Sequence, residues 1–125
     1  MLKRFLALLV APLLLSGCTA TFTNLTPRQQ ARTTNNVYRV EVALASRQQT
    51  LRWDSIQPKV IVGDNTYPMH ATPLMTNRFE GLIPVAPGTD SVHYRYRFDF
   101  NYNAFGGPRP DSTVSPDYKL KIVEP

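Results

Sequence analysis

The feature that most constrains the fold of this chain is an unbroken alternation of apolar and polar side chains over residues 91–103. Its apolar positions are Val92, Tyr94, Tyr96, Phe98, Phe100 and Tyr102. Successive side chains of a strand point to opposite faces, so the pattern predicts a β-strand with one buried face. Thirteen residues would extend about 43 Å, which is longer than strands in small domains usually are. We therefore expect this strand to bend, to contain a bulge or to project as a ribbon.

Shorter strand signals surround this segment. Apolar alternation or β-branched residues predict strands at 37–44, 59–62, 66–69, 79–85 and 118–123. Gly63-Asp64-Asn65 predicts a hairpin turn, and Pro68, which has no N–H to donate, places the strand after that turn at a sheet edge. Residues 70–78 and 104–117 have no clear period, and Gly106, Gly107, Pro108 and Pro110 fall in the second of them. We expect loops in both places.

Taken together, these segments predict an all-β fold. Six or seven short strands without a helix favour a small antiparallel β-sandwich of about seven strands, immunoglobulin-like or fibronectin-like. The sequence lacks the Cys…Trp…Cys spacing of immunoglobulin domains, so the prediction concerns architecture alone. Cys18 is the one cysteine, which leaves no internal disulfide and requires an ordinary hydrophobic core.

The first 18 residues have the composition of an export signal. Lys3 and Arg4 precede an apolar run from Phe5 to Leu15, and Ser16-Gly17-Cys18 follows. The run is too short to cross a bilayer, which needs about 20 apolar residues. The tetrapeptide Leu15-Ser16-Gly17-Cys18 resembles the lipobox of bacterial lipoproteins. That resemblance implies cleavage before Cys18, which would then carry a diacylglycerol thioether and an acylated amino terminus. A plain secretory signal is the alternative.

The signal divides the chain into three predicted parts. Residues 1–17 are the lipoprotein signal peptide, 18–36 the acylated cysteine and a flexible tether, and 37–125 the β-sandwich domain. Residues 19–36 are rich in Thr, Asn and Gln and show no sustained period, which is typical of a tether. The alternatives are that Phe22 and Leu25 dock onto the domain or that residues 27–33 form a helical turn.

Charge gives little indication of a polyanionic partner. The chain has 14 basic and 9 acidic residues, and removal of Lys3 and Arg4 with the signal leaves a side-chain charge of about +3. The basic residues are spaced singly, without the stripe that nucleic-acid binding requires or the run of a polybasic membrane patch. We therefore expect no nucleic-acid partner.

The sequence offers few groups for catalysis or metal binding. Its two histidines are His70 and His93, its carboxylates are scattered, and no strained nucleophile motif of the G-x-S-x-G type occurs. A zinc site would need more His or Cys ligands than the mature chain has. We predict no catalytic residues, no metal and no cofactor. A small envelope enzyme stays as an alternative, and it requires His70 or His93 within hydrogen-bond reach of a carboxylate in a cleft.

Aromatic residues give the better indication of binding. The inward stripe from Tyr94 to Phe100 is expected to fill the core. The far end of that stripe, Phe100 and Tyr102 with Phe105 beyond it, exceeds what a small core covers. With Trp53, these residues are the candidate binding aromatics, and an exposed aromatic platform would suit a sugar ring or a protein partner.

These observations predict a lipoprotein of the bacterial cell envelope, lipid-anchored through Cys18 in the outer membrane and facing the periplasm rather than the cell exterior. Thr19 agrees with the outer membrane, because in the lipoprotein family an aspartate at that position favours the inner membrane. The β-sandwich is expected to be a non-catalytic protein-binding or structural module, with an envelope protein pairing along an edge strand. A carbohydrate-binding module that uses exposed aromatics is the alternative.

Overall fold

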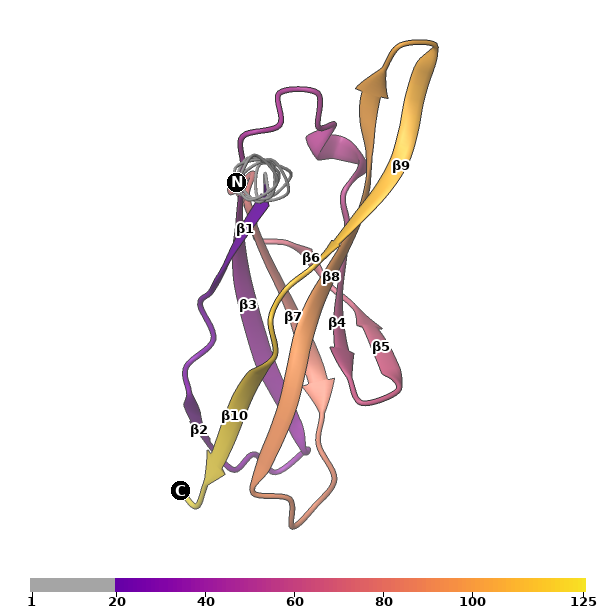
Figure 1. Cartoon of the computed structure of the whole chain (residues 1–125). Helices are drawn as coiled ribbons and strands as arrows, with labels where there is room; N and C mark the ends of the chain where they lie inside the picture. Colours follow the sequence, from indigo (N-terminus) through magenta and orange to yellow (C-terminus); the bar gives the residue numbers. More distant parts are fainter. Residues whose placement is uncertain (1–19) are drawn as a thin grey trace, which may run out of the picture.

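The computed structural model describes residues 20–125, which form two packed β-sheets (Figure 1). The elements are β1 (Ala20–Asn24), β2 (Gln29–Ala31), β3 (Val37–Ser46), the 3-10 helix η1 (Trp53–Ser55), β4 (Gln57–Val62), β5 (Asn65–Pro68), β6 (His70–Ala71), β7 (Arg78–Pro84), β8 (Ser91–Ala104), β9 (Gly107–Val114) and β10 (Tyr118–Val123). Across residues 20–125 no helix is long and apolar enough to cross a membrane. Residues 1–17 and Cys18, with the predicted signal and lipidation site, lie outside the described part.

The order of the strands defines an immunoglobulin-like sandwich. One sheet has the order β1-β3-β7-β6 and the other β2-β10-β8-β4-β5, with β9 paired to β8. The strands β1, β3, β4, β6, β7, β8 and β10 therefore take the positions A to G of an immunoglobulin domain, whose sheets are ABED and GFC. The predicted antiparallel sandwich of about seven strands is confirmed, and β2, β5 and β9 are additional. The β2–β10 pair is parallel.

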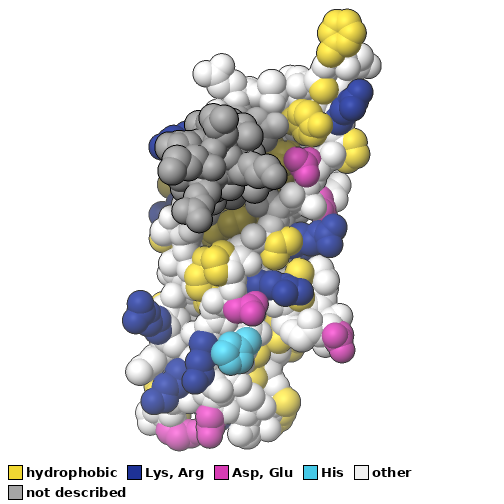
Figure 2. Space-filling view, in the orientation of Figure 1, with side chains coloured by type: hydrophobic (Ala, Val, Ile, Leu, Met, Phe, Trp, Pro, Cys, Tyr) yellow, Lys and Arg dark blue, Asp and Glu magenta, His cyan; other side chains and the backbone are white. Residues whose placement is uncertain are grey.

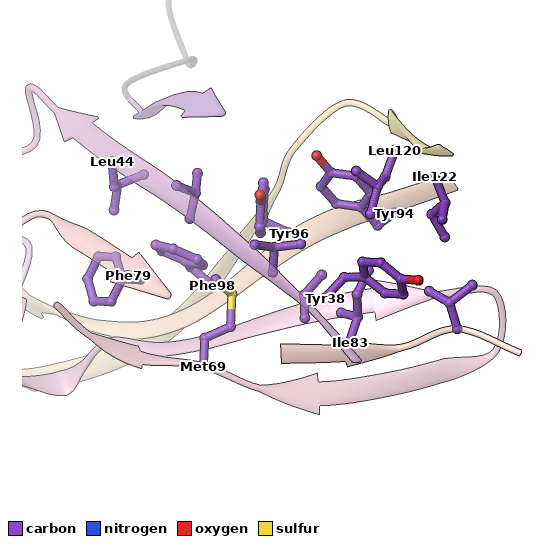
Figure 3. Packing of buried hydrophobic residues seen from close by; sticks show 14 residues of the cluster. Tyr38, Leu44, Met69, Phe79, Ile83, Tyr94, Tyr96, Phe98, Leu120 and Ile122 are labelled. Carbon is purple, nitrogen blue, oxygen red and sulfur yellow. The ribbon is translucent and has the colours of Figure 1, made fainter. Parts of the chain in front are cut away.

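The aromatic stripe of β8 forms the centre of the core between the sheets (Figure 3). Tyr96 and Phe98 are 0% exposed, and the ring of Phe98 meets Phe22 and Phe79 edge-on at centroid distances of 5.2 and 4.8 Å. Figure 3 shows the stripe packed against side chains of β3, β7 and β10. The prediction that this stripe fills the core is confirmed.

The end of β8 continues past the sandwich as a two-stranded ribbon with β9 (Figure 1). The pairing runs from Arg97↔Val114 to Ala104↔Gly107, with Phe105 and Gly106 at the turn. A projecting ribbon was one of the three alternatives expected for this long strand, and the prediction of a loop at 104–117 is wrong for Ala104 and for residues 107–114. Prolines disfavour a central strand, yet alternate residues of an antiparallel edge strand need no N–H toward the partner. Pro108 and Pro110 are two residues apart and satisfy that condition.

The prediction of a flexible tether over 18–36 is wrong for the described residues 20–36, and the alternative that Phe22 docks on the domain holds. Strand β1 pairs with β3 from Ala20↔Ser46 to Asn24↔Val42, and β2 pairs with β10. Arg32 forms salt bridges to Asp90 (2.9 Å) and Glu124 (2.7 Å). Its polar composition is typical of a solvated tether, whereas several of its polar side chains make specific hydrogen bonds. Ala20 and the residues that follow it therefore belong to the folded domain.

The remaining predicted elements agree closely with the structure. The hairpin turn after β4 contains Gly63 at φ +59°, and β5 with Pro68 is the edge of its sheet. In the loop predicted at 70–78, the first two residues pair with β7 as the short strand β6.

Candidate binding surfaces

The four candidate binding aromatics have different surroundings. Phe100 is buried at the base of the ribbon, and Tyr102 is half-buried and forms a β-bridge with Leu51. Trp53 starts η1 and is 39% exposed, whereas Phe105 at the ribbon turn is 102% exposed. Phe100 is thus part of the core, and Trp53 and Phe105 present the largest accessible aromatic surfaces of the four.

Trp53 lines a groove between η1 and the start of β7. Ile56, Met69, Met75 and Phe79 give this groove an apolar lining, and its volume is about 480 Å³. Asp54, His70 and Thr76 add polar groups at its rim. The carbohydrate-binding alternative uses exposed aromatics, and Trp53 is partly exposed here beside these polar side chains.

A chain of charged side chains crosses the outer face of the β1-β3-β7-β6 sheet. Arg78 contacts Glu41 at 3.3 Å, Arg39 lies between Glu41 (3.8 Å) and Glu80, with which it is hydrogen-bonded, and His70 Nε2 lies 3.2 Å from Glu80 Oε1. The cross-strand register produces this chain, because Glu41 lies opposite Glu80 and His70 opposite the same Glu80. Because basic and acidic side chains alternate along this chain, the carboxylates of Glu41 and Glu80 can lie next to each other on one face of the sheet.

Beside this charged chain lies a second groove of about 480 Å³. Tyr67, Pro68, Gly81 and Leu82 form its apolar lining, and Arg39, His70 and Glu80 form its charged side. Leu82 is 60% exposed there. Glycine is required at position 81, because a Cβ would lie 2.9 Å from Met69 Cγ and 3.2 Å from the carbonyl oxygen of Pro68. The groove therefore combines an exposed apolar side chain with charged groups of both signs.

The enzyme alternative meets one of its geometric conditions at this groove. His70 is within hydrogen-bond distance of the Glu80 carboxylate, but Glu80 also binds the Arg39 guanidinium. Acyl transfer would also need a hydroxyl or thiol nucleophile, and the side chains that line this groove include only the Tyr67 phenol. His93 lies on the exposed face of β8, opposite Lys119. Within residues 20–125, no three His, Cys, Asp or Glu side chains converge to hold a metal ion.

A buried hydroxyl network connects the amino-terminal segment to both sheets. Tyr96 donates its hydroxyl hydrogen to Asn24 Oδ1 at 2.7 Å, and Asn24 Nδ2 donates to the Tyr94 hydroxyl at 2.8 Å. Thr26 Oγ1 lies 3.0 Å from the Tyr96 hydroxyl and accepts the backbone N–H of Glu41 at 2.8 Å. Every one of these polar groups would be costly to bury alone. The network therefore fixes residues 24–26 in the sandwich.

The network makes stability sensitive to high pH. Burial of the Tyr96 hydroxyl raises its pKa far above the ordinary 10.0. As pH rises, the Tyr96 hydroxyl loses its proton in the unfolded chain before it does so in the folded chain. The contribution of Tyr96 to the free energy of unfolding is therefore complete below about pH 10 and is lost as pH rises toward the folded-state pKa. We expect the unfolding free energy to fall by about 1.4 kcal/mol per pH unit above pH 10 from this residue. Urea denaturation between about pH 9 and about pH 11 should show a shallower fall for Tyr96→Phe, and equal slopes would contradict a buried hydroxyl.

A further charged cluster lies where the ribbon leaves the sandwich. Asp99 accepts from Lys59 Nζ at 2.7 Å and from Arg97 Nε at 3.1 Å. These hydrogen bonds, that from Lys59 first, hold the pKa of Asp99 below its ordinary value. With the Ser55 hydroxyl, which donates to the carbonyl oxygen of Asn101, the cluster braces the base of the ribbon.

Comparison with known proteins finds only remote structural similarities. No protein-family model matches the chain, and no curated protein matches it by sequence. Two similar solved structures are the endo-β-1,4-mannanase of Thermotoga petrophila and murine CRIg. The mannanase is 14% identical with a TM-score of 0.47, and the match covers 85% of this chain and 20% of the mannanase. CRIg is 11% identical with a TM-score of 0.47, and the match covers 83% of this chain and 99% of CRIg.

Proposed function

We propose that this protein is a bacterial outer-membrane lipoprotein whose immunoglobulin-like domain is a non-catalytic protein-binding module facing the periplasm. Leu15-Ser16-Gly17-Cys18 supports the anchor, and Thr19 supports the outer membrane. Two or more acyl chains give stable attachment, because each buried methylene contributes about 0.8 kcal/mol.

The observation that carries the binding role is the groove at Leu82. An exposed apolar side chain surrounded by charged groups is the usual composition of a protein interface, with an apolar centre and a polar rim. The charges are already fixed by the cross-strand chain of Arg39, Glu80 and His70, so little side-chain entropy is lost when a partner binds. The groove lies beside two edge strands, because Tyr67 and Pro68 belong to β5 and His70 belongs to β6.

The anchor is tested by Cys18→Ala. We expect this change to abolish metabolic labelling with a fatty acid and to move the protein from the membrane fraction to the soluble fraction, because no thioether can form. Cys18→Ser is the matched control for the loss of sulfur alone and should behave in the same way. Acyl labelling that persists in either variant would contradict the lipobox.

The same cells test the partner surface. A photoreactive amino acid at position 82 should crosslink to one discrete envelope protein in intact cells, and crosslinking should stop when Arg39→Ala is added. The matched control is position 114, where Val114 is similarly exposed on the other sheet. Equal crosslinking from positions 82 and 114, or none from position 82, would contradict a binding role for the groove.

A further inference from the structure

The ribbon and the start of the folded domain lie at the same end of the molecule (Figure 1). Ala20 pairs with Ser46, and the loop after Ser46 returns to the ribbon, where Thr50 accepts the Asn103 N–H at 2.8 Å. Ala20 and Phe22 of β1 also line one groove of about 440 Å³ with Phe100 and Asp111, the pair at the base of the ribbon. Ala20, the first described residue, therefore lies beside the ribbon base.

The distances bring the ribbon to the membrane surface. Cys18 is two residues before Ala20, so extended chain separates them by about 7 Å at most. From Phe100 to the turn at Phe105 the ribbon extends about 17 Å at the usual strand rise. The headgroup layer on each side of a bilayer is about 5–8 Å thick. Because the ribbon is longer than the extended chain between Cys18 and Ala20, its tip reaches the headgroup layer, even when the ribbon is tilted to the membrane surface.

The chemistry of the tip suits the lipid interface. Residues 102–108, Tyr-Asn-Ala-Phe-Gly-Gly-Pro, contain no charge. Phe105 is fully exposed at the turn, and Figure 2 shows a hydrophobic side chain standing alone at the tip of the ribbon. Gly106 at φ +93° and Gly107 at φ +127° close the turn without side chains. A lone aromatic ring flanked by polar groups is typical of residues that insert into the interface.

We propose that the tip of the β8–β9 ribbon is a second membrane contact, in which the Phe105 ring inserts among the lipids of the leaflet that holds the Cys18 anchor. The proposal rests on the proposed lipid anchor. Pro108 and Pro110 favour lipid over strand pairing with another chain, since they remove N–H donors from the outer edge of β9. Once the anchor is inserted, it holds the ribbon at a high effective concentration next to the lipids. The ribbon contact therefore needs little affinity of its own.

Bromolipid quenching tests this contact in the acylated full-length protein. Trp53 is the only tryptophan, so Trp53→Phe allows one reporter at a time. The test variant adds Phe105→Trp and the matched control adds Leu82→Trp, an exposed position on the sheet face. Both are reconstituted into phosphatidylethanolamine and phosphatidylglycerol vesicles with or without brominated acyl chains, and only vesicle-floated protein with an acylated Cys18 by mass spectrometry is read.

We expect brominated lipids to reduce the emission of the position 105 reporter about twofold, as for a ring at the headgroup and acyl boundary, and to leave the position 82 reporter unchanged. Floated, acylated protein without quenching at position 105 would overturn the ribbon contact and leave the anchor standing. A blue-shifted but unquenched reporter would place the ring in a protein contact and overturn it equally. An unacylated Cys18 in protein purified from membranes would overturn the anchor and the ribbon contact together.

Discussion

Phe98→Ala should reduce the free energy of unfolding by about 3–5 kcal/mol, the usual cost of truncating a fully buried aromatic ring. Phe98 is 0% exposed and contacts Phe22 and Phe79 edge-on. Loss of the ring opens a cavity between β1, β7 and β8. The sheets cannot close this cavity without shifting the pairing of their strands. Because small domains have a total stability of about 5–15 kcal/mol, this loss is a large fraction of the total. Urea denaturation followed by circular dichroism measures the effect.

Phe105→Ala is the matched control for this result. It removes the same ring from the same ribbon-forming region, but at a fully exposed position, and should change stability by less than about 0.5 kcal/mol. If Phe98→Ala and Phe105→Ala reduced the free energy of unfolding by similar amounts, Phe98 would not lie in the core as the structure places it.

Thr26→Val should reduce the free energy of unfolding by about 1–3 kcal/mol, although valine has nearly the same shape. The hydroxyl accepts the backbone N–H of Glu41 and contacts the Tyr96 hydroxyl. Valine leaves the Glu41 N–H without its partner in a buried site, and an unsatisfied buried donor costs more than the bond contributes. Guanidinium denaturation of the full chain measures the change.

Thr23→Val is the control for Thr26→Val, because Thr23 lies three residues earlier, in β1, and its side chain is exposed. Valine is a good strand residue there, so stability should be unchanged or slightly raised. If Thr26→Val were as neutral as Thr23→Val, residues 24–26 would not be held by the hydroxyl network.

The sequence predicted those parts of the fold whose side chains follow a strict period. The alternation from Val92 to Tyr102 identified β8 and its buried face, and its length indicated a bend, a bulge or a projecting ribbon, of which the structure has the ribbon. Gly63 and Pro68 identified a hairpin and a sheet edge, because each residue has a backbone property that fits few other positions. From such local rules the number of core strands and the sandwich class could be obtained.

The errors fell where polar residues have long-range partners. Asn24 and Thr26 resemble linker residues until their partners Tyr94 and Tyr96, about seventy positions away, are known. The prolines of β9 indicated a loop because the sequence does not show that this strand is an edge. The Phe22 side chain was the one indication of β1 in the sequence. A single apolar residue does not predict a strand, and its contact with Phe98 is visible only in the structure.

The candidate surfaces were partly foreseen. Of the four candidate binding aromatics, Phe105 and Trp53 are accessible and Tyr102 is half-buried, whereas Phe100 is buried. The groove at Leu82 was missed, because it depends on the register that places Arg39 opposite Leu82 and Glu41 opposite Glu80. Cross-strand register involves residues about forty positions apart, and no local pattern encodes it.

Hydrogen exchange at the amino-terminal segment most directly tests whether residues 20–36 belong to the folded domain, on which the proposed ribbon contact depends. The Leu25 N–H bonds the carbonyl oxygen of Glu41 at 2.9 Å, and the Arg32 N–H bonds that of Val123 at 2.8 Å. Both amides in the full chain should exchange at least about a hundredfold more slowly than in an unstructured peptide, which corresponds to an opening free energy of about 2.8 kcal/mol. Exchange of both amides at the rate of an unstructured peptide would restore the flexible tether and separate the anchor from the ribbon.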